Sequence, residues 1–278
     1  MIRAAVAATW LLMLPALLLL AVCFVLPLVH LIGLSLGSPA GPFAPYADLL
    51  GSAVYRTVFF NTFAFAVVVT IVALLLAFPL ALAMSRLSRG VRALLFAAVL
   101  LPLWISVLVR TFAWMLLLET NGPINRLLLG AGLIGKPLAL LFNHWGVLIG
   151  MVHVLLPYAV LPIYAALLRI DPGLLRASAG LGAGRFTTFR RVLLPQARAG
   201  VLTGASFVFL LSLGFFITPA LLGGARDITL AMLIDSFVEE QLVWPLAGAA
   251  SVVLLAATLA VLAIAGRSFS PARLAGAA

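Results

Sequence analysis

Residues 60–84 read FNTFAFAVVVTIVALLLAFPLALAM and contain no charged side chain. A helix of this length can cross a bilayer, because about 20 apolar residues span its hydrocarbon core. Over the whole chain of 278 residues, 65% are hydrophobic and 9% are charged. A soluble domain has about 25% charged residues. The sequence therefore predicts an all-α, polytopic membrane protein.

Apolar blocks of similar length recur along the chain and predict six transmembrane helices in a single membrane domain over 1–278. The expected spans are 10–34, 60–84, 93–118, 145–168, 200–222 and 245–266. The first block is longer than the apolar region of a signal peptide, so we expect it to be retained as a span. Cleavage near Ser38 is the alternative.

Basic residues are unevenly divided between the two sides that these spans define. One side carries twelve basic residues and one acid, Asp171, whereas the other carries five basic residues and six acids. The twelve are Arg3, Arg86, Arg89, Arg92, Arg169, Arg176, Arg185, Arg190, Arg191, Arg198, Arg267 and Arg273. Because basic loops stay inside the cell, we expect both termini and the loop between spans four and five to be cytoplasmic.

That loop contains RASAGLGAGRFTTFRRVLLP at 176–195, a stretch rich in glycine and arginine. Asp171 followed by Pro172 is typical of a helix start, and Gly182 is suited to a left-handed stop. A second short helix should follow. Its apolar face and closing proline are expected at Phe186, Phe189, Leu193 and Pro195.

The same loop resembles the cytoplasmic signature of binding-protein-dependent ABC importer permeases, which is Glu-Ala-Ala, three residues, Gly, nine residues, then Ile-x-Leu-Pro. Here Gly182 is followed after nine residues by Val-Leu-Leu-Pro, and Arg176 replaces the glutamate of the upstream triplet. The resemblance implies that the loop forms coupling helices in a groove of an ATPase subunit. The residues expected to take part are Arg176, Ala177, Ser178, Gly182, Ala183, Phe186, Phe189, Val192, Leu194 and Pro195.

Two further segments, LPLWISVLVRTFAWMLLLETNGPIN at 101–125 and NHWGVLIGMVHVLLPYAVLPIYAAL at 143–167, are similar to spermidine/putrescine-type permeases. The resemblance implies a core permease region at about 55–268 in a bacterial inner-membrane protein that imports a polyamine or similar small organic cation. It also implies three partners besides the lipid bilayer: a cytoplasmic ABC ATPase dimer, a second homologous permease and a periplasmic substrate-binding protein. The chain has no Gly-x-x-x-x-Gly-Lys-Ser/Thr phosphate loop. We therefore expect no cofactor here, with ATP and Mg on the partner ATPase.

Polar side chains inside the spans are candidates for a substrate path, because they are costly in lipid. His153 lies near the middle of span four, and Ser206, Ser212 and Thr218 lie on span five. Each has a structural alternative: a hydrogen bond to a neighbouring helix for His153, and bonds to their own helix for the hydroxyls. Arg110 is expected to reach the outer surface as an anchor.

An acidic group precedes the last span. Asp235 and Glu239 are four residues apart on one helical face, with Glu240 beside them. Such a face would suit a cationic substrate or a basic patch on the protein that delivers it. A solvated acidic loop is the alternative.

Other classes of function fit less well. A stand-alone secondary transporter or channel is an alternative, but none of the seven acids falls near the middle of a span. An enzyme using Ser206 and His153 would need an oxyanion site, which the Phe-Val-Phe after Ser206 does not offer. The sequence contains no paired histidines or carboxylates that would predict a metal site. Despite a net charge of +10, the basic residues form no face for nucleic acid. We expect no enzymatic activity in this chain.

Overall fold

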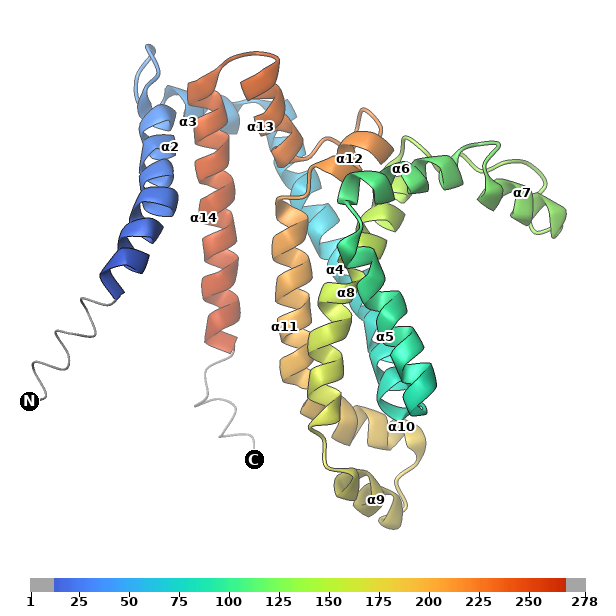
Figure 1. Cartoon of the computed structure of the whole chain (residues 1–278). Helices are drawn as coiled ribbons and strands as arrows, with labels where there is room; N and C mark the ends of the chain where they lie inside the picture. The colour runs from blue at the N-terminus through green and yellow to red at the C-terminus, as the bar shows by residue number, and fades with distance from the viewer. Residues whose placement is uncertain (1–12, 269–278) are drawn as a thin grey trace, which may run out of the picture. The chain divides into compact units, whose positions relative to one another are not determined.

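The computed structural model describes residues 13–268, which form helices joined by loops, without a β-strand (Figure 1). Arg3, Arg273 and the start of the predicted span 10–34 lie outside these residues. The helices, with η for π-helix, are η1 (Ala21–Val25), α2 (Leu26–Leu36), α3 (Ala44–Gly51), α4 (Ala53–Arg86), α5 (Arg89–Trp104), α6 (Val107–Leu118), α7 (Pro123–Gly130), α8 (His144–Leu168), α9 (Pro172–Gly180), α10 (Arg185–Thr188), η2 (Phe189–Leu193), α11 (Leu194–Leu213), α12 (Ile217–Leu222), α13 (Leu230–Glu239) and α14 (Trp244–Ser268).

The chain divides into two compact units. The first is built from the described parts of Met1–Arg56 and Leu233–Ala257, and the second from those of Thr57–Met232 and Thr258–Ala278. In the first unit, Ser35 of α2 is buried and shares a 2.7 Å hydrogen bond with the hydroxyl of Tyr46 in α3. Helix α14 approaches α2 closely, since a Cβ on Gly248 would lie 2.9 Å from the Ser35 nitrogen.

Helix α8 lies at the centre of the second unit, packed against α11 and α5 (Figure 1). Met151, Leu155, Ala159 and Ile163 recur every four residues and are buried. This spacing places them on one stripe of the helix. Helix α4 contributes small side chains that let the helices approach closely. Its fully buried alanines are Ala66, Ala73, Ala77 and Ala81.

The predicted continuous span 93–118 is broken. Ile105 and Ser106 are extended, with ψ of 134° and 138°, and they separate α5 from α6. The bend between Arg89–Trp104 and the segment Val107–Gly130 is 106°. Five other helices within 13–268 are long and apolar enough to cross a membrane, so the predicted six is reached when this bent pair counts as one span.

The predicted span 200–222 is also interrupted, because α11 ends at Leu213 and α12 begins only at Ile217. The helices that follow the two interruptions meet in space: α6 packs against α12, and the hydroxyls of Thr111 and Thr218 share a 3.1 Å hydrogen bond. Each broken span therefore ends in a short helix that contacts the other.

Helix α11 is preceded by helical structure that continues through Pro195, so the predicted stop at this proline is wrong. Pro195 lies in the first turn of α11, where its missing N–H leaves few bonds unmade. The preceding turn is a π-helix, in which the Leu194 N–H donates to the carbonyl of Phe189. This wider turn lets the chain pass the proline ring without ending. The continuous helical segment Arg185–Leu213 is the resulting span candidate.

Candidate functional site

The loop 171–195 folds as two short helices joined by a left-handed turn. Asp171 caps α9 by accepting the Gly173 N–H at 2.7 Å, and Pro172 occupies the first turn. Gly182 has a φ of 77°, the region that favours glycine. The turn is closed by an N–H···O bond of 3.1 Å from Ala183 to Ser178. The predicted helix start and the predicted glycine turn are both confirmed.

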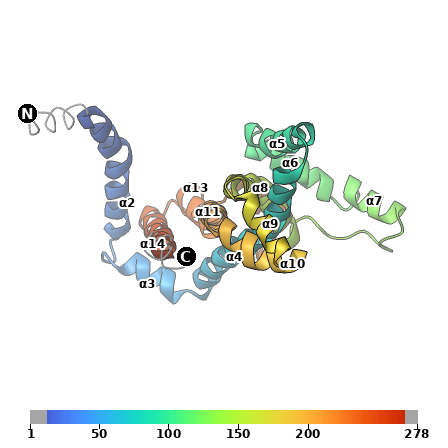
Figure 2. The same cartoon turned by 90° about the horizontal axis from the view of Figure 1, so that it is seen from below.

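Side-chain contacts fix this loop to the rest of the second unit. The hydroxyls of Ser178 in α9 and Thr188 in α10 share a 2.9 Å hydrogen bond, which joins the two short helices. Phe189 packs edge-on against Phe78 of α4, with ring centroids 5.5 Å apart. Figure 2, viewed from below, shows α9 and α10 lying together. The loop is thus a packed element rather than a loose connection.

The outer surface of the loop carries two large apolar side chains. Leu181 is 88% exposed and Phe186 is 73% exposed. The predicted single face of Phe186, Phe189 and Leu193 is not formed, since Leu193 is buried while Phe186 faces outward. The π-helical turn at Phe189–Leu193 interrupts the 3.6-residue period on which that prediction rested.

The remaining residues predicted for this loop are divided by exposure. Exposed residues are Arg176, Ala177, Gly182, Leu194 and Pro195, and half-buried residues are Ser178, Ala183, Phe189 and Val192. The exposure of Leu181 was not predicted, because a single leucine between glycines has no periodicity to assign it to a face. Together these residues form a surface with Arg176 and apolar groups but no acid.

The two helices that flank the loop are in close contact. A Cβ on Gly200 of α11 would lie 2.5 Å from the carbonyl oxygen of Pro162 in α8, and one on Gly204 would lie 3.1 Å from that of Ala159. Glycines four residues apart lie on the same helix face and let two backbones approach. The loop is therefore connected at its two ends to helices, α8 and α11, that pack tightly on each other.

The predicted path residues have mostly found partners inside the protein. The Trp114 indole N–H donates to Nδ1 of His153 at 3.0 Å, and Ser212 donates to the Val208 carbonyl at 2.7 Å. Both contacts match the structural alternatives. His153 also lines a cavity of about 170 Å³ beside Pro102 and Pro157. Ser206 is half-buried and makes no side-chain hydrogen bond within 13–268.

Arg110 lies differently from its predicted position. The bend before α6 means that the residue does not lie on the single straight helix from which that position was predicted. Its Nε and Nη1 atoms are buried and have no hydrogen-bond partner among the described residues. Because the residue as a whole is half-buried, the guanidinium is enclosed on one side only.

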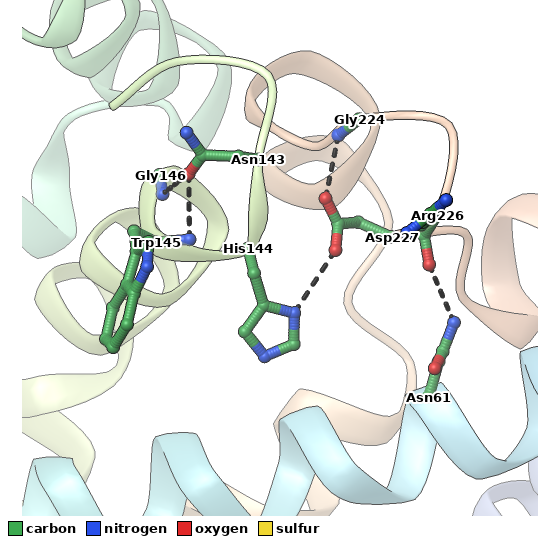
Figure 3. A network of polar contacts seen from close by, with 8 residues as sticks. All are labelled: Asn61, Asn143, His144, Trp145, Gly146, Gly224, Arg226 and Asp227. Carbon is green, nitrogen blue, oxygen red and sulfur yellow. Dashed lines mark hydrogen bonds and ion pairs between the residues drawn. The ribbon is translucent and has the colours of Figure 1, made fainter. Parts of the chain in front are cut away.

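A polar network joins α4, α8 and the loop after α12 (Figure 3). Asp227 is only 7% exposed; its Oδ2 accepts the Gly224 N–H at 2.9 Å, and its Oδ1 lies 3.1 Å from Nδ1 of His144. The His144 ring stacks on Phe65, with centroids 4.2 Å apart. Asn61 adds a 2.8 Å bond to the carbonyl of Arg226. Sequence reasoning missed this network, because its members are separated by 83 and 165 residues.

The predicted acidic group lies on and just after α13. Asp235, Glu239 and Glu240 are all exposed. Glu240 accepts a 2.8 Å hydrogen bond from Ser236. In the part of the chain that the structure describes, no three histidine, cysteine or acidic side chains gather as a metal site.

Comparison with known proteins gives concordant results. The profile of the family "binding-protein-dependent transport system inner membrane component" matches residues 49–272. The spermidine/putrescine transport system permease protein PotB of Haemophilus influenzae is 34% identical over 71% of this chain and 69% of its own length. PotB of Escherichia coli is 32% identical over 72% and 73%. A crystal structure of a bacterial alginate ABC transporter, in complex with a periplasmic protein, contains a chain of the same fold (TM-score 0.78, 19% identity, 96% of both chains).

Proposed function

The chain belongs to the family of binding-protein-dependent transport system inner membrane components, and we propose that it forms half of the substrate path of an ATP-driven polyamine importer. It is a multi-pass permease subunit of an ABC importer. In the proposal, the loop 171–195 faces the cytoplasm and docks on a separate ATPase dimer. A second, homologous permease completes the path, and a periplasmic binding protein delivers the substrate.

The observation that carries the proposal is the construction of the loop. A flexible loop would deform when a partner moved, without moving the helices attached to it. This loop is instead held by the Ser178–Thr188 hydrogen bond and by the packing of Phe189 on Phe78. Its outward side presents Leu181 and Phe186, apolar groups that would be buried by docking. Burial of apolar area contributes roughly 25 cal/mol per Å². Since Arg176 replaces the family's glutamate, the contact is proposed to be mainly apolar.

The proposed mechanism is alternating access driven by the partner's ATP cycle. Closure of the ATPase dimer displaces the loop, and the close Gly200 and Gly204 contacts carry that displacement into α8 and α11 together. At the other ends of these helices lie α12 and α6, which pack on each other. Broken helices of this kind can tilt without breaking a long hydrogen-bonded helix, and they line substrate sites in other transporters.

Two observations support a polyamine as the substrate. The two relatives named above are spermidine/putrescine permeases, each matched over about seven tenths of this chain. The exposed acids Asp235, Glu239 and Glu240 offer negative charge that would attract a polycation.

Substitution of Gly182 tests the coupling role. A valine at Gly182 meets open space but requires a φ of 77°, which a β-branched residue disfavours strongly. Gly180 is the matched control, because it also has open space around its Cβ position but has no positive φ. We expect Gly182→Val to reach the membrane and to lose spermidine uptake by at least about tenfold, a loss of about 1.4 kcal/mol in coupling. Gly180→Val should keep most uptake, and normal uptake by Gly182→Val would contradict the proposal.

A further inference from the structure

A cavity of about 550 Å³ lies between the end of α4 and the loop helices. Its apolar floor is formed by Leu82 of α4 with Leu175, Phe189 and Leu193 of the loop. Two arginines line it as well: Arg86 is the last residue of α4, and Arg185 is the first residue of α10. The cavity thus brings positive charge from two elements to one apolar space.

No acid balances these two charges. None of the residues that line the cavity is acidic, and within 13–268 neither arginine side chain donates a hydrogen bond or forms an ion pair. The nearby hydroxyl of Thr188 is already bonded to Ser178. Asp171, the loop's acid, uses Oδ1 to cap α9. Two like charges facing one cavity favour an anion between them.

The position of Arg86 along α4 indicates where this anion comes from. Helix α4 has 34 residues, so it is about 51 Å long at 1.5 Å per residue. The hydrocarbon core is about 30 Å thick, and the bilayer with headgroups about 40–45 Å. The last turn of α4 therefore lies at or beyond the level of the headgroups, where phosphate groups are dense.

We propose that this cavity binds the headgroup of an anionic phospholipid, with the phosphate between Arg86 and Arg185 and the glycerol and upper acyl carbons on the apolar floor. A free phosphate would leave that floor empty. The bound lipid would join α4 to the loop by charge-assisted hydrogen bonds and hold the loop against the membrane. The assignment of this leaflet to the cytoplasmic side, and of the loop to coupling, rests on the proposed function.

The experiment measures lipid bound to the purified full-length chain, without any ATPase. The chain in mild detergent is mixed with phosphatidylglycerol or with phosphatidylcholine, and bound lipid is counted by native mass spectrometry. We expect phosphatidylglycerol to be retained over phosphatidylcholine, and the double substitution Arg86→Gln/Arg185→Gln to reduce this retention at least about tenfold. Arg190→Gln/Arg191→Gln removes the same charge from exposed positions of the loop outside the cavity and should retain the lipid.

Several results would overturn the proposal. These are equal retention of the two lipids, equal loss in both double variants, or displacement of phosphatidylglycerol by excess inorganic phosphate, which would indicate a site for a free anion. A crosslink from Arg185→Cys to an ATPase subunit in the assembled importer, with no lipid bound, would assign the cavity to a protein partner instead. The double variant Arg86→Lys/Arg185→Lys, which keeps both charges, should retain the lipid. Its circular dichroism spectrum serves as the control for folding. Since the lipid count needs no ATPase, its failure leaves the coupling proposal untouched, and failure of coupling leaves the lipid count unchanged.

Discussion

Arg110 carries a positive charge that lacks a hydrogen-bond acceptor at its buried nitrogens. Two of its three guanidinium nitrogens are buried without an acceptor, although the residue as a whole is half-buried, and partial removal of a charge from water without a partner is unfavourable. Such a group is rarely kept for the stability of the chain that carries it. Nδ1 of His153 already accepts the Trp114 N–H, so this nitrogen is not free to accept a hydrogen bond from the guanidinium.

Arg110→Met should therefore raise the thermal stability of the isolated chain in detergent. We expect a gain of about 1 kcal/mol, the low end of what replacing buried charges by apolar groups contributes. The measurement is the midpoint of thermal unfolding, with Arg126→Met as the control because Arg126 is exposed on α7. A fall in the midpoint for Arg110→Met would show that the guanidinium has a stabilising contact within this chain.

His144 and Asp227 should be energetically coupled. Their side chains are 3.1 Å apart; Asp227 is nearly buried, whereas His144 is about half exposed. Removal of His144 leaves Oδ1 of Asp227 without this partner, while Oδ2 keeps the Gly224 N–H. A double-mutant cycle with His144→Ala and Asp227→Ala should give a coupling energy of about 1–2 kcal/mol in unfolding free energy. The pair His144 and Asp171, at opposite ends of α8, should be additive. Additivity for both pairs would remove the network of Figure 3 as a stabilising contact.

At the scale of helices, apolar length was readable from the sequence and helix interruptions were not. Long apolar blocks predict a span wherever backbone hydrogen bonds must close within the helix, and this places α4, α8 and α14 correctly. The interruption at Ile105–Ser106 follows Pro102 within an apolar block. The interruption between Leu213 and Ile217 contains a single glycine, Gly214, as its one helix-breaking residue. Hydropathy does not change at either point. Both interruptions are followed by helices that pack on each other, α6 and α12, and no local sequence pattern records this long-range contact.

Helix contact through small residues gives the first prediction for a single element. Gly200→Val should separate α11 from α8, since the added side chain would fall 2.5 Å from both Ala166 Cβ and the Pro162 carbonyl. We expect a destabilisation of about 1–3 kcal/mol from overpacking and backbone shift. The matched control is Ala199→Val, next in sequence and exposed. Thermal unfolding of both variants measures the difference, and equal midpoints would argue against a tight contact.

The acidic side chains on and just after α13 give the second prediction for a single element. Neutralising Asp235, Glu239 and Glu240 as Asn, Gln and Gln should raise the KM for spermidine uptake several-fold with little change in maximum rate, because attraction of a cation acts on its local concentration. The effect should shrink at high salt, since exposed charges are screened. Asp48→Asn, another exposed acid, is the control. An unchanged KM at low salt would leave these acids as solvated surface.

At the scale of the whole molecule, the composition settles the class of protein, while the orientation depends on how one bent pair of helices is counted. If α5 and α6 together cross the membrane once, the chain is on the same side before α5 and after α8. If the pair enters and returns, these two positions lie on opposite sides. The distribution of arginines favours one crossing, because Arg89 and Arg92 would otherwise face the side opposite Arg176 and Arg185.

Cysteine labelling distinguishes these two topologies. In a background where Cys23, exposed on the first span, is replaced by Ala, the exposed residues Ser88 and Leu181 are each changed to Cys. We expect both to react with a membrane-impermeant maleimide only after spheroplasts are opened. Asn121→Cys, on the other side of α8 from Leu181, should react in intact spheroplasts and serves as the control. Labelling of Ser88→Cys and Leu181→Cys from opposite sides would mean that the bent pair is re-entrant, and the count would fall to five spans with the N-terminus and the loop 171–195 on opposite faces of the membrane.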